Sequence, residues 1–120
     1  MVVDDAPDNL RVSELLLTAL DCDVACCSDG ESCLRAIEEV RPDLVLLDLG
    51  LPHMNGVTVG NHVRQMPLSP MPLIVAVTGF GDSHTIESCL AAGFDRHIIK
   101  PISVEQLETL IAEARARNAD

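Results

Sequence analysis

The chain has 120 residues, of which 48% are hydrophobic, so residues 1–120 fit one domain that buries its core without disulfides or a structural metal. Its net charge of -11 and its two aromatic residues argue against direct nucleic-acid binding, because phosphate contacts need Lys or Arg and base stacking needs aromatic rings. No apolar run approaches the length of a transmembrane helix and no export leader is recognised, so we expect no membrane insertion and a cytoplasmic location.

Three apolar segments in the first half of the chain predict strands, and a helical pattern follows each of them. We expect the strands at residues 1–3, 23–27 and 44–48. We expect the helices at residues 7–20, 33–40 and 57–65. The first helix would bury a face that includes Val12, Leu15 and Leu16.

The second half of the chain repeats this alternation. Strands are expected at residues 73–78 and 94–99, with a helix between them that is capped by Asp82 or Ser83. A last helix would begin at a capping box formed by Ser103 and Gln106, and residues 114–120 would fray. Five strands that alternate with five helices predict a doubly wound parallel sheet.

The third predicted strand ends at a carboxylate. Leu44 to Leu47 are all branched aliphatic residues, which indicates a strand buried on both faces, and Asp48 follows them directly. The turn formers Gly50 and Gly56 then take the chain away from the sheet. Asp48 therefore stands at the carboxyl end of a parallel strand, where open α/β sheets bind ligands.

Other polar residues follow the other strands at the same edge of the predicted sheet. Asp4 and Asp5 follow the first strand, Thr78 ends the fourth, and Lys100, which is the only lysine, follows the fifth. Carboxylates about 4 Å apart repel by roughly 4 kcal/mol near a protein surface, so a cation is needed to keep all three ionised. Oxygen-only ligands favour a hard ion, and Mg²⁺ fits best.

This set of side chains is suited to accepting a phosphoryl group. The Asp48 carboxylate can act as a nucleophile and form an acyl phosphate, while Mg²⁺, Lys100 and Thr78 compensate the charge on the transferred oxygens. The five cysteines are odd in number and contain no Cys-x-x-Cys pair, so neither a disulfide framework nor a zinc site is expected.

The motifs resemble those of response-regulator receiver domains of two-component signalling. They are Val3-Asp-Asp5, Leu46-Leu-Asp-Leu-Gly-Leu-Pro52 with Gly56, Val77-Thr-Gly79 and Lys100-Pro101. The resemblance covers almost the whole chain and implies a flavodoxin-like sheet with strand order 2-1-3-4-5. The sequence directly after the fourth strand and the sequence directly before Lys100 resemble those of the receivers of hybrid histidine kinases.

The resemblance assigns roles to the acidic residues. It implies that Asp48 is the phosphoacceptor and also a Mg²⁺ ligand, that Asp5 binds Mg²⁺ directly and that Asp4 binds it through water. Gly50 would contribute its backbone carbonyl to the metal. Residues Gly50 and Phe80 stand where the family tunes hydrolysis, and since neither has a polar side chain we expect slow loss of the phosphoryl group.

The resemblance also implies a switch. Thr78 matches the switch hydroxyl, Lys100 matches the phosphate-sensing lysine, and the Lys100–Pro101 peptide bond is expected to be cis. His97 replaces the usual aromatic switch residue, so it either takes part in switching or is a surface residue of the strand. By analogy, the fourth and fifth helices and the fifth strand would form the contact surface for an output partner.

The function expected from the sequence is that of a phosphoryl-accepting switch. Its donor would be a histidine kinase or a histidine phosphotransfer domain. Its output would come through a partner protein or a fused domain outside this chain. It would catalyse only its own phosphoryl transfer and hydrolysis. A receiver-like docking module without phosphorylation is the alternative, and a phosphate hydrolase is less well supported because Gly50 replaces the second acid of an Asp-x-Asp pattern.

Overall fold

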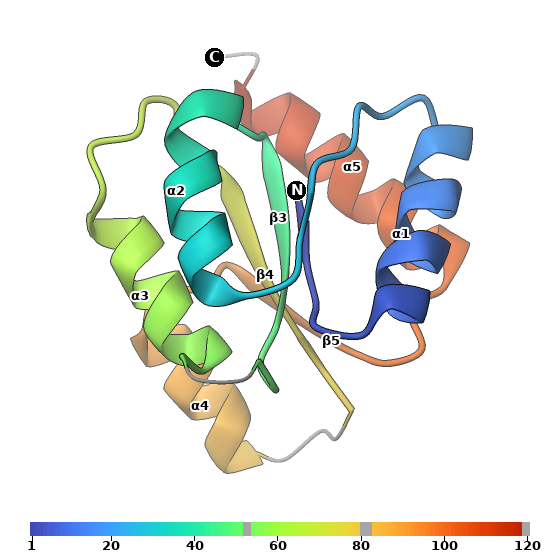
Figure 1. The fold of residues 1–120 in the computed structure, drawn as a ribbon. Helices are drawn as coiled ribbons and strands as arrows, with labels where there is room; N and C mark the ends of the chain where they lie inside the picture. Colours follow the sequence, from blue (N-terminus) through green and yellow to red (C-terminus); the bar gives the residue numbers. More distant parts are fainter. Residues whose placement is uncertain (52–53, 80–82, 119–120) are drawn as a thin grey trace.

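The computed structural model describes residues 1–51, 54–79 and 83–118, so Phe80 and Asp82 lie outside the described residues. Five parallel strands form one sheet in the order β2-β1-β3-β4-β5, as predicted (Figure 1). The elements in chain order are β1 (Val2–Val3), α1 (Pro7–Ala19), β2 (Cys26–Cys27), α2 (Gly30–Val40), β3 (Leu44–Asp48), α3 (Gly56–Gln65), β4 (Leu73–Thr78), α4 (Ser83–Ala91), β5 (Arg96–Ile99) and α5 (Val104–Asn118).

The sheet is covered by helices on both faces. In Figure 1, α1 and α5 lie on one face and α2, α3 and α4 on the other. Because both faces are covered, β3 and β4 are almost completely buried, which explains their uniformly apolar sequences. The core on the α2–α3–α4 face includes Cys33, Ile37, Val59, Val63 and Phe94. The core on the α1–α5 face includes Leu17, Leu46, Leu107, Leu110 and Ile111.

The first strands are shorter than predicted. β1 has two residues, and its register pairs Val2 with Cys26 of β2 and with Leu46 of β3. β2 therefore covers Cys26–Cys27 and not residues 23–27, because its parallel ladder with β1 begins where Val2 pairs with Cys26. The central pair is longer, with β3 and β4 matched over five residues.

The buried face of α1 differs from the prediction. Val12 and Leu15 are 56% and 59% exposed, whereas Leu17 is 5% exposed. The helix packs on the sheet through Leu17 together with Leu16 and Leu20. The apolar pattern of α1 is wide enough to fit several rotations of the helix, and the sheet selects one of them.

Residues 114–120 were predicted to fray, and this prediction is wrong for residues 114–118; residues 119–120 lie outside the described residues. The helix extends to Asn118, and Ala114 is only 2% exposed because it packs in the core. Arg117 Nη1 lies 3.1 Å from Asp95 Oδ1, which ties the last turn to the loop before β5. Both contacts join residues that are distant in sequence.

Side-chain caps fix where the helices begin. The Asn55 side chain accepts a hydrogen bond from the N–H of Thr58 at the start of α3. The predicted capping box of α5 is confirmed, because Ser103 Oγ accepts from the N–H of Gln106 and Gln106 Oε1 accepts from the N–H of Ser103. In the described residues, no helix is long and apolar enough to cross a membrane.

Candidate functional site

The loop after β1 and the last residue of β3 bring three carboxylates together at one edge of the sheet (Figure 1). Asp4, Asp5 and Asp48 each offer an oxygen within 4.8 Å of the others. Asp4 and Asp48 are 6% and 8% exposed, whereas Asp5 is exposed to solvent. The side chains that the sequence placed at these strand ends therefore share one site.

Lys100 pairs with the two buried carboxylates. Its Nζ lies 3.2 Å from Asp48 Oδ2 and 3.5 Å from Asp4 Oδ2. Partial burial of the ammonium opposes its charge, but the neighbouring Asp48 and Asp4 outweigh burial and raise the pKa of Lys100. Lys100 is therefore a cation that neutralises part of the acidic site.

Backbone hydrogen bonds orient the two buried carboxylates. Asp48 Oδ1 accepts from the N–H of Gly50 at 2.9 Å, and Asp4 Oδ1 accepts from the N–H of Ala6 at 2.9 Å. The second oxygen of each carboxylate is the one that faces Lys100. Asp48 Oδ2 is thus the oxygen directed toward the shared space.

Gly56 lets the start of α3 approach the loop that follows Asp48. A side chain at residue 56 would place its Cβ 2.5 Å from the carbonyl oxygen of Asp48 and 2.6 Å from the Cα of Leu49. The N–H of Gly56 also donates to the carbonyl of Leu49. The loop that follows Asp48 therefore packs against the start of α3. The sequence identified Gly56 only as a turn former and did not reveal this contact.

Thr78 and Lys100 lie at neighbouring strand ends. The N–H of Lys100 donates to the carbonyl of Thr78 at 2.7 Å, and the Thr78 residue is half-buried. The Lys100–Pro101 peptide bond is cis, and so is Ser69–Pro70, for which the sequence gave no expectation. Gly50 is exposed beside Asp48.

His97 lies on β5, opposite Ala76 in the register with β4. Its strand neighbour Ile98 packs in the α1–α5 core, so His97 is directed to the opposite face of the sheet, as is Thr78, two residues beyond Ala76. The Nε2 atom of His97 is buried and has no hydrogen-bond partner. Among the described residues, it is the one buried side-chain nitrogen or oxygen atom that lacks a hydrogen-bond partner. His97 is therefore an unusual position.

An apolar hollow of about 220 Å³ adjoins the acidic site and lies between α1 and the loop after β5. Its lining includes Val12 and Leu16 from α1, Ile102 from the loop, and Asp48 and Lys100 from the site itself. The sequence did not reveal this hollow, because the apolar residues of α1 were all assigned to the core.

The donor set fits a hard divalent cation. Three carboxylates converge without cysteine or histidine, and oxygen ligands of this kind suit Mg²⁺ better than zinc. Lys100 alone cannot balance three negative charges, so the acidic site keeps a net negative charge that a bound cation would offset.

The sequence profile of the response regulator receiver domain family matches residues 1–112. The chain is 35% identical over 120 residues to the DNA-binding response regulator MtrA of Mycolicibacterium smegmatis. It is 36% identical over 118 residues to the transcriptional regulatory protein KdpE of Mycobacterium tuberculosis. These matches cover 100% and 98% of this chain but 51% of each relative, so the chain spans about half the length of these curated relatives.

Two solved structures show the same fold. A response regulator from Chloroflexus aurantiacus has a TM-score of 0.88 with 29% identity, and the match covers 96% of this chain and 94% of that one. The receiver domain of the sensor histidine kinase PA1611 from Pseudomonas aeruginosa has a TM-score of 0.87 with 28% identity and the same coverage. That structure holds a magnesium ion in its active-site cleft.

Proposed function

Because the chain belongs to the family of response regulator receiver domains, we propose that Asp48 accepts a phosphoryl group from a phosphohistidine and that the domain works as a signalling switch. The observation that carries this proposal is the position of Asp48, whose Oδ2 lies 3.2 Å from Lys100 at a site shared with Asp4 and Asp5. Receiver domains are signalling proteins, so the only chemistry proposed for this chain is its own phosphorylation and dephosphorylation.

The geometry supports a direct displacement at phosphorus. Asp48 Oδ1 is held by the N–H of Gly50, which leaves Oδ2 as the attacking oxygen. As the new O–P bond forms, the P–N bond of the phosphohistidine breaks and the imidazole leaves with the electron pair of that bond. Lys100 then exchanges its contact with the carboxylate for one with the phosphoryl oxygens.

Asp4, Asp5 and Asp48, with the backbone carbonyl of Gly50, would hold a Mg²⁺ ion. When bound, the ion offsets the negative charge on the phosphoryl oxygens and on the acidic site. The convergence of the three carboxylates within 4.8 Å supports this assignment. Asp5 is the most accessible of the three, which suits a direct ligand.

We assign the switch to Thr78 and His97. Both lie on the face of the sheet that α4 covers, and Thr78 is adjacent to Lys100 through the backbone hydrogen bond between them. A movement of the Thr78 hydroxyl toward the phosphoryl group would alter the surroundings of His97, whose buried Nε2 has no partner to hold it. Gly50 offers no polar side chain to orient water, so the phosphorylated form should hydrolyse slowly.

Two apolar surfaces suit protein partners. Exposed Val12 on α1 borders the hollow beside Asp48, and Leu15 is exposed three residues further along the same helix. Both would contact the protein that carries the phosphohistidine. Exposed Leu90, Ile99 and Val104 on α4, β5 and α5 would contact the output partner. A histidine kinase or a histidine phosphotransfer domain is the proposed donor.

The proposal can be tested with acetyl phosphate and Mg²⁺, with intact mass as the readout. The parent protein should gain the mass of one phosphoryl group, and chelation of Mg²⁺ should prevent the gain. Asp48→Asn should remove the adduct, because an amide oxygen is a much weaker nucleophile. Asp21→Asn is the matched control, since Asp21 is an exposed carboxylate with the left-handed backbone that Asn tolerates.

An adduct that persists in Asp48→Asn would refute the assignment of the phosphoacceptor. If neither acetyl phosphate nor a phosphohistidine donor modified the folded parent protein, the docking module would become the better description.

A further inference from the structure

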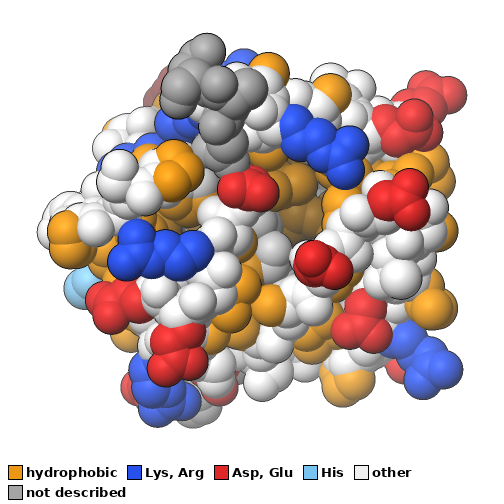
Figure 2. Space-filling view, turned by 90° about the horizontal axis from the view of Figure 1, so that it is seen from above, with side chains coloured by type: hydrophobic (Ala, Val, Ile, Leu, Met, Phe, Trp, Pro, Cys, Tyr) orange, Lys and Arg blue, Asp and Glu red, His pale blue; other side chains and the backbone are white. Residues whose placement is uncertain are grey.

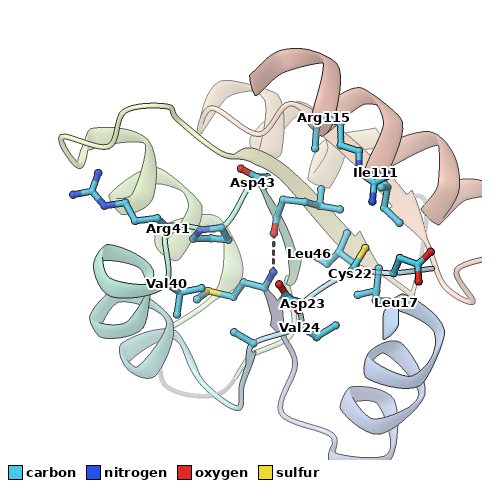
Figure 3. A pocket seen from close by; sticks show the side chains of 16 residues that line it. Leu17, Cys22, Asp23, Val24, Val40, Arg41, Asp43, Leu46, Ile111 and Arg115 are labelled. Atoms are coloured by element: carbon cyan, nitrogen blue, oxygen red, sulfur yellow. Dashed lines mark hydrogen bonds between the residues drawn. The ribbon is translucent and has the colours of Figure 1, made fainter. Parts of the chain in front are cut away.

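The apolar hollow of about 220 Å³ opens directly onto the reacting groups of the acidic site. Asp48 and Lys100, whose carboxylate and ammonium lie 3.2 Å apart, both belong to its lining. A larger cavity of about 390 Å³ lies at the amino ends of the strands, where Figure 2 shows hydrophobic side chains in its depth and acidic side chains around it. Asp43 and Arg115 are among the side chains that line this cavity (Figure 3), and no residue of the acidic site is. Of these two spaces, the hollow is the one that joins an apolar surface to the proposed phosphoacceptor.

The apolar walls of the hollow come from the sheet, from α5 and from the loop before α5. Val2, Leu46 and Val77 belong to the neighbouring strands β1, β3 and β4, and all three face the α1–α5 side of the sheet. Leu107 of α5 and Ile102 of the loop complete these walls. A group that enters the hollow is therefore surrounded by branched aliphatic side chains.

The wall that α1 contributes explains why the space is not filled. Asn9, Val12, Ser13 and Leu16 line the hollow, and their spacing places them on one face of the helix. Two of these four residues, Asn9 and Ser13, have short polar side chains. They leave open a volume that larger apolar side chains at the same two positions would occupy.

The size and the charges of the hollow together indicate what it can hold. An apolar cavity of about 150 Å³ is enough for a benzene molecule, so a hollow of about 220 Å³ accommodates a phenyl group. Lys100 is the cation of the lining and stands beside Asp48. A molecule with a phosphoryl group at Lys100 and a ring between Leu16 and Ile102 would match both the charged and the apolar part of this surface.

We propose, on the basis of the phosphorylation of Asp48 proposed above, that the hollow selects acyl phosphates with a phenyl-sized apolar acyl group as small phosphodonors. Asp48 Oδ2 forms the new O–P bond as the bond between phosphorus and the acyl oxygen breaks, and the carboxylate leaves with the electron pair of that bond. The leaving oxygen stays opposite Asp48 Oδ2, while rotation about the bonds on either side of it turns the ring into the hollow.

The hollow would favour the donor over the product. Transfer of the ring from water to the apolar walls stabilises the bound donor. After transfer, the leaving group is a carboxylate, and a charged group is costly to hold against aliphatic side chains. Asn9 and Ser13 are then specificity-determining residues, because their short side chains make room for the ring.

The experiment compares benzoyl phosphate with acetyl phosphate in the presence of Mg²⁺, with intact mass over time as the readout. Ser13→Leu places a larger apolar side chain in the hollow and should lower the ratio of the benzoyl rate to the acetyl rate by about tenfold. The ratio cancels both the different reactivity of the two donors and any change in the acidic site that affects them equally.

Thr18→Leu is the matched control, because Thr18 is exposed on the same helix and does not line the hollow. Its rate ratio should equal that of the parent. Circular dichroism checks that the variants fold. If Ser13→Leu does not fold, Asn9→Leu takes its place, since Asn9 lines the same wall and is exposed.

Binding without transfer gives a second readout. Benzylphosphonate carries a phenyl group and cannot transfer its phosphorus, and methylphosphonate is the same probe without the ring. In the presence of Mg²⁺, benzylphosphonate should bind the parent about tenfold more tightly and should shift the NMR signals of the Ser13 and Ile102 amides. Ser13→Leu should remove the difference between the two phosphonates.

The same rate ratio in the parent and in the variant that fills the hollow would overturn the inference, and so would equal binding of the two phosphonates to the parent. If acetyl phosphate labels Asp48 while either of these results is found, the proposed function stands and the inference about the hollow fails alone. If neither donor labels the folded parent, the proposed function fails and the inference fails with it.

Discussion

At the scale of single residues, the three carboxylates of the acidic site differ in the partners that offset their charge. Asp4 and Asp48 are buried and each accepts one backbone N–H and faces Lys100, whereas Asp5 is exposed. A buried carboxylate without such partners would be costly, so Lys100 and the two N–H groups permit a preformed site. Asp5 adds a third negative charge that these groups do not offset.

Asp5→Asn should therefore weaken Mg²⁺ binding without lowering the stability of the metal-free protein. Without Mg²⁺ the variant should be at least as stable as the parent, because a charge next to Asp4 and Asp48 is removed. Mg²⁺ at about a hundred times its dissociation constant should stabilise the parent by about 2.7 kcal/mol and the variant far less. Urea unfolding with and without Mg²⁺ measures both effects.

Asp8→Asn is the control for this comparison, since Asp8 is an exposed acid in the first turn of α1 and should leave the response to Mg²⁺ unchanged. A full response to Mg²⁺ in Asp5→Asn would show that the carboxylate of Asp5 is not a ligand.

The ionisation of Asp95 makes the stability of the fold depend on pH, and this effect is independent of the acidic site. Burial opposes its ionisation, but hydrogen bonds from the N–H of Ile74 and from Arg64 and Arg117 outweigh burial and lower the pKa of Asp95. A lowered folded-state pKa means that this stabilisation is complete above the ordinary value of 3.8 and is lost as the pH falls through the folded-state pKa.

Asp95→Ala should reduce the free energy of unfolding by about 2 kcal/mol at neutral pH, because it removes the acceptor of the Ile74 N–H and the carboxylate that pairs with Arg64 and Arg117. Arg64 keeps the carbonyl of Gly93 as an acceptor. The deficit should shrink as the pH falls below 3.8. Urea unfolding over this range measures it, with Glu39→Gln on the exposed side of α2 as control. A deficit that does not change with pH would mean that Asp95 acts by packing alone.

At the scale of the elements, α3 and the loop after β3 determine where Asp48 stands. The loop leaves the sheet at Leu49, whose N–H donates to the carbonyl of Val77, and returns against the start of α3 at Gly56. The backbone there leaves no room for a Cβ atom. The helix thus acts on the site through the main chain of Asp48 and not through a side chain.

Gly56→Ala should lower stability by about 2 kcal/mol, because the new Cβ would overlap the backbone of Asp48 and Leu49 and the main chain cannot move freely. It should also slow phosphorylation by acetyl phosphate. Gly79→Ala is a suitable control for stability, since a Cβ at that position meets no atom of the described residues within 4 Å. Equal stability of the two variants would show that the loop adjusts without cost.

At the scale of the whole molecule, the two ends of the sheet present different residues. The carboxyl ends of the strands hold the acidic site, and a cavity lined by both apolar and charged residues lies at the amino ends. On α1, Val12 lines the hollow beside the acidic site and Leu15 is exposed three residues further along, and we propose that a phosphohistidine protein meets this surface. Acetyl phosphate does not need this surface, so the two kinds of donor can be distinguished.

Leu15→Lys should slow transfer from a phosphohistidine protein by about tenfold, because an apolar contact residue becomes charged, and should leave phosphorylation by acetyl phosphate unchanged. Val40→Lys provides the control, as Val40 is 46% exposed on α2, away from this surface. The ratio of the two transfer rates is the measurement. A parallel loss of both reactions in Leu15→Lys would indicate damage to the site, and no loss in either would refute the docking surface.

The sequence by itself determined the alternation of strands and helices and the identity of the residues at the strand ends, whereas the strand order followed from the resemblance to the receiver family. It could do so because uniformly apolar strands, helical spacing and turn formers are local signals, and a parallel sheet brings the carboxyl ends of its strands to one edge. It also identified the capping box of Ser103 and Gln106, which involves residues three apart.

Only the tertiary structure decided which face of α1 is buried, how far α5 continues and where β2 begins. The pairing of Asp95 with Arg117 and the buried Nε2 of His97 likewise depend on it. These features arise from contacts between segments that are distant in the chain. Their energies depend on packing and register, which no local pattern of residues contains.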